Sequence, residues 1–248
     1  MNRTVLYETK NKTAVIKMNR PHVKNAINRE MHEELHQAFS RADEDPDVRV
    51  IVLTGEGDAF SSGADLKSIP VEEMENFDHG AYLAETYNKL ILLMDEIEKP
   101  IVAYVSGLAV GAGLSLALAC DFRYADKKAA FSLSFLQIGL APDAGASYYL
   151  PRIVGLSRAI ELGTGVKIDT EKAERIGLIS GTDYPEAVIQ QLTEAPAPAY
   201  GLMKKNFKNS FDQPLESVLE EEIKAQRLAG KSRPHQKALQ AFLQKSKG

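Results

Sequence analysis

Segments with the pattern of β-strands alternate with segments with the pattern of α-helices through the first half of the chain. Apolar runs at residues 13–18, 49–54 and 101–105 predict buried strands, each followed by turn-forming residues. Apolar residues recur at helical spacing after Asn28, a candidate N-cap, and again at residues 90–97. Strands that alternate with helices of this length are joined by crossover connections and pair mostly in parallel. The sequence therefore predicts an α/β fold.

The pattern changes after about residue 190, where two prolines mark a turn and only helical spacing follows. The apolar residues beyond this point form stripes of the kind that pack into a core or against another subunit. A chain of 248 residues suits one large α/β domain with a helical appendage. We therefore expect a core at residues 1–190 and a helical C-terminal region at residues 191–248.

The composition argues against several classes of protein. Hydrophobic residues make up 44% of the chain and charged residues 26%, which is the balance of a globular protein with a buried core. The net charge of −4 does not favour a nucleic-acid partner, which usually requires a basic surface. The single cysteine, Cys120, cannot form an internal disulfide, and its apolar neighbours predict that it is buried. No leader-like or membrane-spanning stretch is recognisable, so we expect a cytoplasmic protein without membrane contact.

Two glycine-bearing turns, at residues 59–66 and 107–114, each follow a predicted strand. Small residues at such turns let the backbone approach a ligand closely, and free N–H groups there stabilise negative charge. The second turn lacks the dinucleotide-binding spacing G-x-G-x-x-G, because Leu116 occupies the third glycine position, so a nicotinamide cofactor is not expected. Either turn alone is equally compatible with a tight connection that binds no ligand.

Five segments match, in order and spacing, the sequence pattern of one enzyme family. They are Asn-Arg-Pro followed by Asn-Ala at 19–26, Ala-Phe-Ser-Ser-Gly-Ala-Asp-Leu at 59–66, Lys-Pro-Ile-Val-Ala through Gly-Ala-Gly at 99–113, Ala-Cys-Asp-Phe-Arg-Tyr-Ala at 119–125, and Gly-Leu-Ala-Pro-Asp-Ala-Gly-Ala through Leu-Pro-Arg at 139–152. The chain thereby resembles the enoyl-CoA hydratase/isomerase (crotonase) superfamily over essentially its whole length. The resemblance implies a spiral of β-β-α units. It also implies that the helical C-terminal region covers the pocket and contacts other subunits of a homotrimer or homohexamer.

The resemblance also implies what the two glycine-bearing turns do. In the family, each turn supplies one backbone N–H to an oxyanion hole, which stabilises the enolate oxygen of an acyl-coenzyme A thioester. By position, the donors in this chain are Ala64 and Ala112. Loss of one such donor typically raises the barrier by ~3 kcal/mol, and alanine suits either position because the backbone donates. The acyl-CoA is then the substrate, and we expect no metal and no other cofactor.

Two positions depart from the hydratase pattern of the family. A typical hydratase holds its water with two glutamates, one placed two residues after the last glycine of the second turn and the other twenty residues further on. This chain has Ser115 and Phe135 at those positions. A serine hydroxyl is a weak acid and base without an activating partner, and phenylalanine makes that wall of the pocket apolar. We therefore expect water addition to be slow.

Asp143 is the acid that the matched segments leave for proton transfer. Together with Phe135 it resembles the phenylacetate-pathway epoxyphenylacetyl-CoA isomerase branch, in which an acid at this place handles protons. An apolar pocket should raise the pKa of Asp143 toward neutrality, which suits a group that takes and returns a proton. The alternative is that Asp143 only caps a short helix at residues 144–149. The dehalogenase branch pairs such an acid with a tryptophan, and this chain contains none.

The resemblance assigns a larger set of residues to coenzyme A and the acyl group, the last two of them from the final helix and across a subunit boundary. The set is Lys24, Ser62, Ala64, Asp65, Leu66, Gly111, Phe135, Phe242 and Lys245. Asp65 and Asp121 are also expected to bind backbone amides. His79 lies in the polar stretch 72–80 and is expected on the surface, with a mobile lid as the alternative.

Three hypotheses for the function remain open. The first is a cofactor-free acyl-CoA isomerase that moves a double bond, or opens an oxygen-bearing ring, by proton transfer through Asp143. The second is an enoyl-CoA hydratase of altered mechanism. The third is a non-catalytic member that binds acyl-CoA or RNA. Asp143 argues against the third hypothesis, and the negative net charge weakens its RNA form.

Overall fold

The computed structural model describes residues 3–68 and 76–245, and its largest sheet has six strands. The strand order is β1-β2-β3-β5-β7-β10, in which β1 and β2 form an antiparallel hairpin and all other neighbours are parallel. The strands are β1 (Val5–Lys10), β2 (Thr13–Met18), β3 (Val50–Gly55), β5 (Ile101–Val105), β7 (Phe122–Ala125) and β10 (Gly181–Thr182). The three apolar runs of the sequence are β2, β3 and β5, to within one residue.

A second sheet has four strands in the order β4-β6-β8-β9. They are β4 (Ala59–Ser61), β6 (Leu108–Val110), β8 (Ala130–Ser132) and β9 (Ile168–Asp169). The chain passes three times from the first sheet directly into the second, as β3-β4, β5-β6 and β7-β8, and each passage is followed by helix. The fold is therefore the spiral of β-β-α units that the resemblance implied.

Eleven α-helices are present in the described part of the chain. They are α1 (Arg29–Glu44), α2 (His79–Glu85), α3 (Tyr87–Glu96), α4 (Ala112–Leu118), α5 (Ala146–Val154), α6 (Leu156–Gly163), α7 (Thr170–Arg175), α8 (Glu186–Glu194), α9 (Ala197–Asn209), α10 (Leu215–Gly230) and α11 (Arg233–Lys245). The side chain of Asn28 accepts a hydrogen bond from the Met31 N–H at 3.0 Å, so the predicted N-cap of α1 is confirmed.

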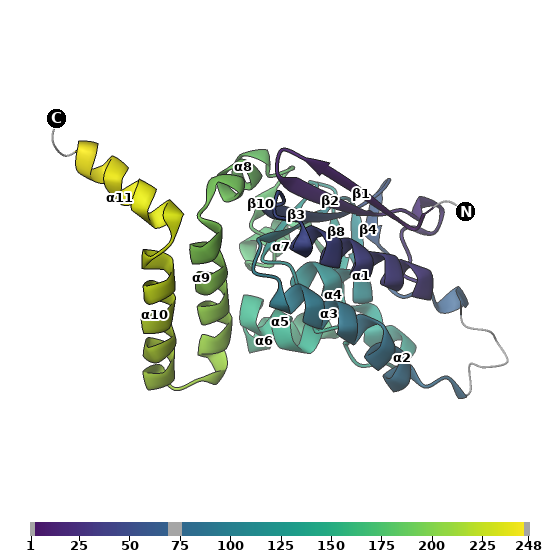
Figure 1. Ribbon diagram of the computed structural model, residues 1–248. Helices are drawn as coiled ribbons and strands as arrows, with labels where there is room; N and C mark the ends of the chain where they lie inside the picture. The colour runs from purple at the N-terminus through teal and green to yellow at the C-terminus, as the bar shows by residue number, and fades with distance from the viewer. Residues whose placement is uncertain (1–2, 69–75, 246–248) are drawn as a thin grey trace.

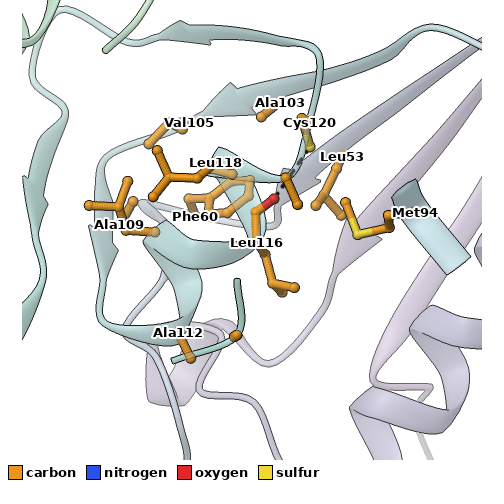
Figure 2. Packing of buried hydrophobic residues seen from close by; sticks show 14 of the residues in the cluster. Leu53, Phe60, Met94, Ala103, Val105, Ala109, Ala112, Leu116, Leu118 and Cys120 are labelled. Atoms are coloured by element: carbon orange, nitrogen blue, oxygen red, sulfur yellow. Dashed lines mark hydrogen bonds between the residues drawn. The ribbon is translucent and has the colours of Figure 1, made fainter. Parts of the chain in front are cut away.

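Helix α4 lies inside the core, and all seven of its residues are buried. Figure 2 shows Leu116 and Leu118 of this helix beside the ring of Phe60 from β4, with Ala112 at the start of the helix. The Cys120 thiol donates to the Leu116 carbonyl at 3.5 Å, and burial raises the pKa of this thiol to about 12. The expected burial of Cys120 is therefore confirmed.

The C-terminal helices lie along one side of the core, and α11 extends away from it (Figure 1). Helix α9 is attached by two lysines, since Lys204 pairs with Asp121 at 2.8 Å and Lys208 pairs with Asp95 at 2.7 Å. Asp121 also accepts from the Ile101 N–H at 2.8 Å, which confirms its expected structural role. The expected boundary at residue 190 lies within α8. None of the helices in the described ranges is both long and apolar enough to cross a membrane.

Candidate active site

A cavity of about 570 Å³ contains most of the residues that the sequence placed in the site. This volume is within the range of small-molecule sites. The walls are formed by the loop after β4, the start of α4, the 3-10 helix at Ser134–Ile138, and parts of α1, α2 and α3. Among the residues proposed from the sequence, those that line the cavity are Ser62, Ala64, Asp65, Leu66, Gly111, Ala112, Phe135 and Asp143.

The two glycine-bearing turns meet at this cavity because β4 and β6 pair in parallel. A β-carbon on Gly63 would lie 2.8 Å from the Val110 carbonyl oxygen and 3.5 Å from the Ala112 nitrogen, and Gly63 has a positive φ of 94°. A β-carbon on Gly113 would lie 2.7 Å from the β-carbon of Ser61. Gly63 is required by its positive φ and its close approach to Val110, and Gly113 is required by its close approach to Ser61.

Ala64 and Ala112 each present a free N–H group at the cavity. Ala64 forms a parallel bridge with Ile27, in which the Ile27 N–H donates to the Gly63 carbonyl and the Asp65 N–H donates to the Ile27 carbonyl. This bridge leaves the Ala64 N–H unused, and Ala112 is the first residue of α4, where no intrahelical acceptor exists. Within the described ranges neither N–H donates to a protein group. Two preset donors on one wall can stabilise an oxygen that gains negative charge.

Asp65 lies beside the first donor but is already paired. Its Oδ2 accepts from the Arg20 guanidinium at 2.7 Å, and only 11% of its side chain is exposed. The same arginine donates to the Ala26 carbonyl at 2.6 Å, so it ties the loop after β4 to the segment before α1. Among the described residues, the partner of the Asp65 carboxylate is the Arg20 guanidinium, and no backbone amide there donates to it.

Asp143 is in a different state from Asp65. Its Oδ1 is buried and has no hydrogen-bond partner within the described residues, and burial raises the pKa of the carboxyl to about 6. The capping alternative is wrong, because α5 begins at Ala146 with Gly145 as its N-cap residue and no side chain caps it. A carboxyl with this pKa can exchange a proton in either direction near neutral pH.

Neither of the two positions that hold glutamate in hydratases carries a carboxylate that could hold and activate water. Ser115 is fully buried, and its hydroxyl donates to the Gly111 carbonyl of the preceding turn at 3.3 Å. Phe135 lines the cavity, and a β-carbon on Gly111 would lie 3.9 Å from the tip of its ring. The wall near the second donor is therefore apolar, as the sequence predicted.

Several residues of the cavity were not found by the sequence reasoning. His79 was expected on the surface, and it is exposed, but it also lines the cavity with its ring 4.9 Å from that of Phe77. Tyr82 and Tyr87 add two more aromatic rings to the same wall. Residues 72–75 of the expected lid lie outside the described residues. The sequence showed only a polar stretch at residues 72–80 and gave no indication that these side chains converge.

Lys24 and Phe242, which the resemblance assigned to coenzyme A, are not among the described residues that line the cavity. Lys24 is exposed, with a positive φ of 52°, and its carbonyl accepts from the Ser62 N–H at 2.9 Å. Phe242 lies on α11 and is 70% exposed. Lys245 ends the same helix, and its side chain lies outside the described part of the structure. Among the described side chains of the final helix, none lines the cavity of the same chain.

The chain is similar to known proteins over nearly its full length. The family model for enoyl-CoA hydratase/isomerase matches residues 8–248. A Rhodobacter capsulatus protein named "Probable enoyl-CoA hydratase" is 39% identical over 98% of this chain and 95% of its own length. The 1,2-epoxyphenylacetyl-CoA isomerase of Escherichia coli is 31% identical over 99% of this chain and 97% of its own. The crystal structure of an enoyl-CoA hydratase from Bacillus anthracis matches with a TM-score of 0.88 at 27% identity, covering 98% of this chain and 96% of that one. The chain therefore belongs to the enoyl-CoA hydratase/isomerase (crotonase) family.

Proposed function

We propose that this chain is an enoyl-CoA isomerase, which shifts a double bond in an acyl-CoA, or opens a ring epoxide, by proton transfer. Asp143 is the group that moves the proton. The N–H groups of Ala64 and Ala112 bind the thioester oxygen while it carries the negative charge of an enolate. The coenzyme A thioester is the substrate, and the proposed reaction requires no metal or other cofactor.

Each atom in the proposed double-bond shift is accounted for. In a 3-enoyl-CoA, the Asp143 carboxylate removes a proton from the carbon between the thioester and the double bond. The electron pair moves onto the thioester oxygen, where the N–H groups of Ala64 and Ala112 stabilise it. Asp143, now protonated, returns its proton to the far end of the dienolate. The product is the conjugated 2-enoyl-CoA, with no atom gained or lost.

The proposal rests on the buried, unpartnered oxygen of Asp143 and on the raised pKa of its carboxyl group. Two other acids line the described cavity, but Glu30 is exposed and Asp65 is paired with Arg20. Asp143 combines a buried oxygen that lacks a partner with a pKa that burial raises to about 6. A buried acid in a cleft with a raised pKa is the pattern of a proton-transfer group. This state also argues against a non-catalytic role for the chain.

Hydration is the competing activity, since one relative is named as a hydratase. Water addition requires groups that hold and activate the water, and Ser115 and Phe135 replace the two glutamates that would do so. The hydroxyl of Ser115 is turned back to its own helix. We therefore expect isomerisation to be the faster reaction.

A comparison of two substrates tests the proposal. The purified protein is given a 3-enoyl-CoA in one assay and crotonyl-CoA in another, and the 2-enoyl thioester is followed by its absorbance. We expect the 3-enoyl-CoA to isomerise faster than crotonyl-CoA is hydrated, with no change when EDTA is added. Faster hydration by a clear margin would mean that another acid organises water and that Asp143 is not the principal group.

We also propose that the chain acts as a trimer or hexamer in the cytoplasm. Large apolar side chains on α10 and α11 are exposed in the single chain, among them Leu219, Ile223 and Phe242. Burial of such side chains against other copies would remove apolar surface from water. In an assembly of this kind, the final helix can reach the coenzyme A of a neighbouring subunit, as expected for Phe242 and Lys245.

A further inference from the structure

Buried polar atoms without a hydrogen-bond partner are concentrated next to the cavity. In the described parts of the chain, such atoms belong to Tyr7, His32, Tyr87, Asp143 and Arg152. Tyr87 and Asp143 both line the cavity, and the ring of His32 packs against that of Tyr87. An unsatisfied buried polar atom lowers the stability of the fold, so several on one wall indicate a function.

Tyr87 is fixed at the start of α3. The preceding residue, Thr86, breaks the helix with φ −121° and ψ −88°, and Tyr87 itself is only 2% exposed. Its ring meets that of His32 edge-on, with a centroid distance of 4.0 Å and an angle of 83°. Burial raises the pKa of the phenol well above its usual value, with the charges of Tyr82, Asp143 and Asp65 adding to the effect. The phenol therefore stays protonated at working pH and can donate a hydrogen bond.

Two side chains near Tyr87, Asp65 and His32, are less suitable than a free carboxylate as acceptors for its hydroxyl. Asp65, after β4, already accepts from Arg20 at 2.7 Å. Burial, with the charge of Arg29, lowers the pKa of His32 to about 4, so this imidazole is neutral near pH 7.

A charged side chain from α1 also lines the cavity, and it already has other contacts. Arg29, on α1, pairs with Glu85 at 3.1 Å and lies over the ring of Tyr82. Among the described residues, Oδ1 of Asp143 is a buried carboxylate oxygen that lacks a hydrogen-bond partner. Its other oxygen, Oδ2, is not among the buried unpartnered atoms, and Asp143 itself lines the cavity.

We propose that Tyr87 is a positioning residue, which donates a hydrogen bond to Oδ1 of Asp143 and leaves Oδ2 to work on the substrate. The bond forms when the acyl group fills the cavity, since catalytic hydrogen bonds are often long without ligand and shorten in the complex. The inference rests on the proposed function for the role of Asp143. A donor to the carboxylate stabilises the charged form, so Tyr87 lowers the pKa of Asp143 in the complex.

The variant Tyr87→Phe removes the hydroxyl and keeps the ring that packs against His32. The profile of kcat against pH reports groups in the substrate complex, and that of kcat/KM reports groups in the free enzyme. We expect the acidic limb of kcat to move up by about one pH unit in Tyr87→Phe, a ~10-fold change in the proton dissociation constant. The limb of kcat/KM should move less. The melting temperature should stay the same or rise, because an unsatisfied hydroxyl is removed.

Tyr149→Phe is the matched control. Its hydroxyl is already satisfied, because it donates to Asp95 at 2.9 Å, and it does not line the cavity. This variant should melt at a lower temperature and leave both limbs in place. Equal movement of the limbs in Tyr149→Phe and Tyr87→Phe would overturn the proposal. A Tyr87→Phe protein that fails to fold would also overturn it, because the hydroxyl would then be structural.

A second measurement does not depend on turnover. The carboxyl carbon of Asp143 is titrated by 13C NMR with butyryl-CoA bound, and its signal is assigned by its loss in Asp143→Asn. A higher pKa in Tyr87→Phe supports the coupling even if the wild-type protein shows no isomerase activity, in which case only the proposed function fails. A pKa within about 0.2 pH units of wild type would refute the coupling.

Discussion

Asp143→Asn tests the central claim about the site with two independent quantities. The amide keeps the size of the side chain but cannot take up a proton. Because burial raises the pKa of the carboxyl to about 6, the wild-type residue is poised to exchange a proton near neutral pH. We therefore expect kcat to fall by ~100-fold or more, in the usual range for a general acid–base group, with little change in acyl-CoA affinity.

The stability of this variant should change in a direction that follows from the same pKa. The native carboxyl has a pKa of about 6 against an ordinary value of 3.8. At ~1.4 kcal/mol per pH unit, ionisation then costs the native state up to ~3 kcal/mol. The side chain is only partly buried, so solvent screening reduces this to ~1–2 kcal/mol. The stabilising contribution of the protonated form is complete below pH 3.8 and is lost as the pH rises through about 6.

Urea denaturation at two pH values, together with a turnover assay, measures both effects. At pH 7, Asp143→Asn should be more stable than wild type by ~1–2 kcal/mol, and at about pH 4 the two proteins should be nearly equal. The combination of a large loss of activity and a gain of stability is specific for a strained functional acid. Activity within a few-fold of wild type would refute the proton-transfer role. A loss of stability at pH 7 would mean that the carboxylate has a stabilising partner.

Two further predictions concern the scaffold. Gly113→Ala should lower both stability, by ~2 kcal/mol, and turnover, because its β-carbon would lie 2.7 Å from that of Ser61. In Gly163→Ala the new β-carbon meets nothing within 4 Å, so the melting temperature of this control should not fall. Lys204→Met should lower the free energy of unfolding by ~3 kcal/mol in urea denaturation, because it leaves the Asp121 carboxylate without its buried cation. A loss below about 1 kcal/mol would mean that this pair behaves like a surface ion pair.

The fold could be predicted because its signals are local. The apolar runs that became β2, β3 and β5 are each a few residues long, and Asn28 caps α1 through a bond to a residue three positions away. The two glycine-bearing turns are also visible locally, because only glycine suits the positive φ of Gly63 and the approach of Gly113 to Ser61. Each of these structural requirements is met by one residue or a short segment, so it can be recognised in the sequence.

The partners of the acids could not be predicted, because they depend on segments distant in the chain. Asp65 was expected to bind backbone amides, and its actual partner, Arg20, comes from the segment before α1. Tyr87 sits at the start of a helix whose spacing indicates only a core face, and its place in the same cavity as Asp143 arises from the packing of α3 against the rest of the cavity wall. No local pattern distinguishes a tyrosine with a bonded hydroxyl, such as the half-buried Tyr149, from one such as Tyr87, whose hydroxyl has no partner among the described residues.

The two parts of the proposed chemistry therefore differ in how strongly the sequence encodes them. Backbone donors require small residues and a fixed backbone path, so the family resemblance of the two glycine-bearing turns was enough to propose Ala64 and Ala112 by position. A proton-transfer group requires a particular pKa, which arises from burial and from the absence of a neutralising partner. Asp65 and Asp143 line the same cavity and are the same residue type, yet Arg20 neutralises one while the other stays unpaired. Their different roles are decided by which side chains reach them, and that is a property of the folded chain.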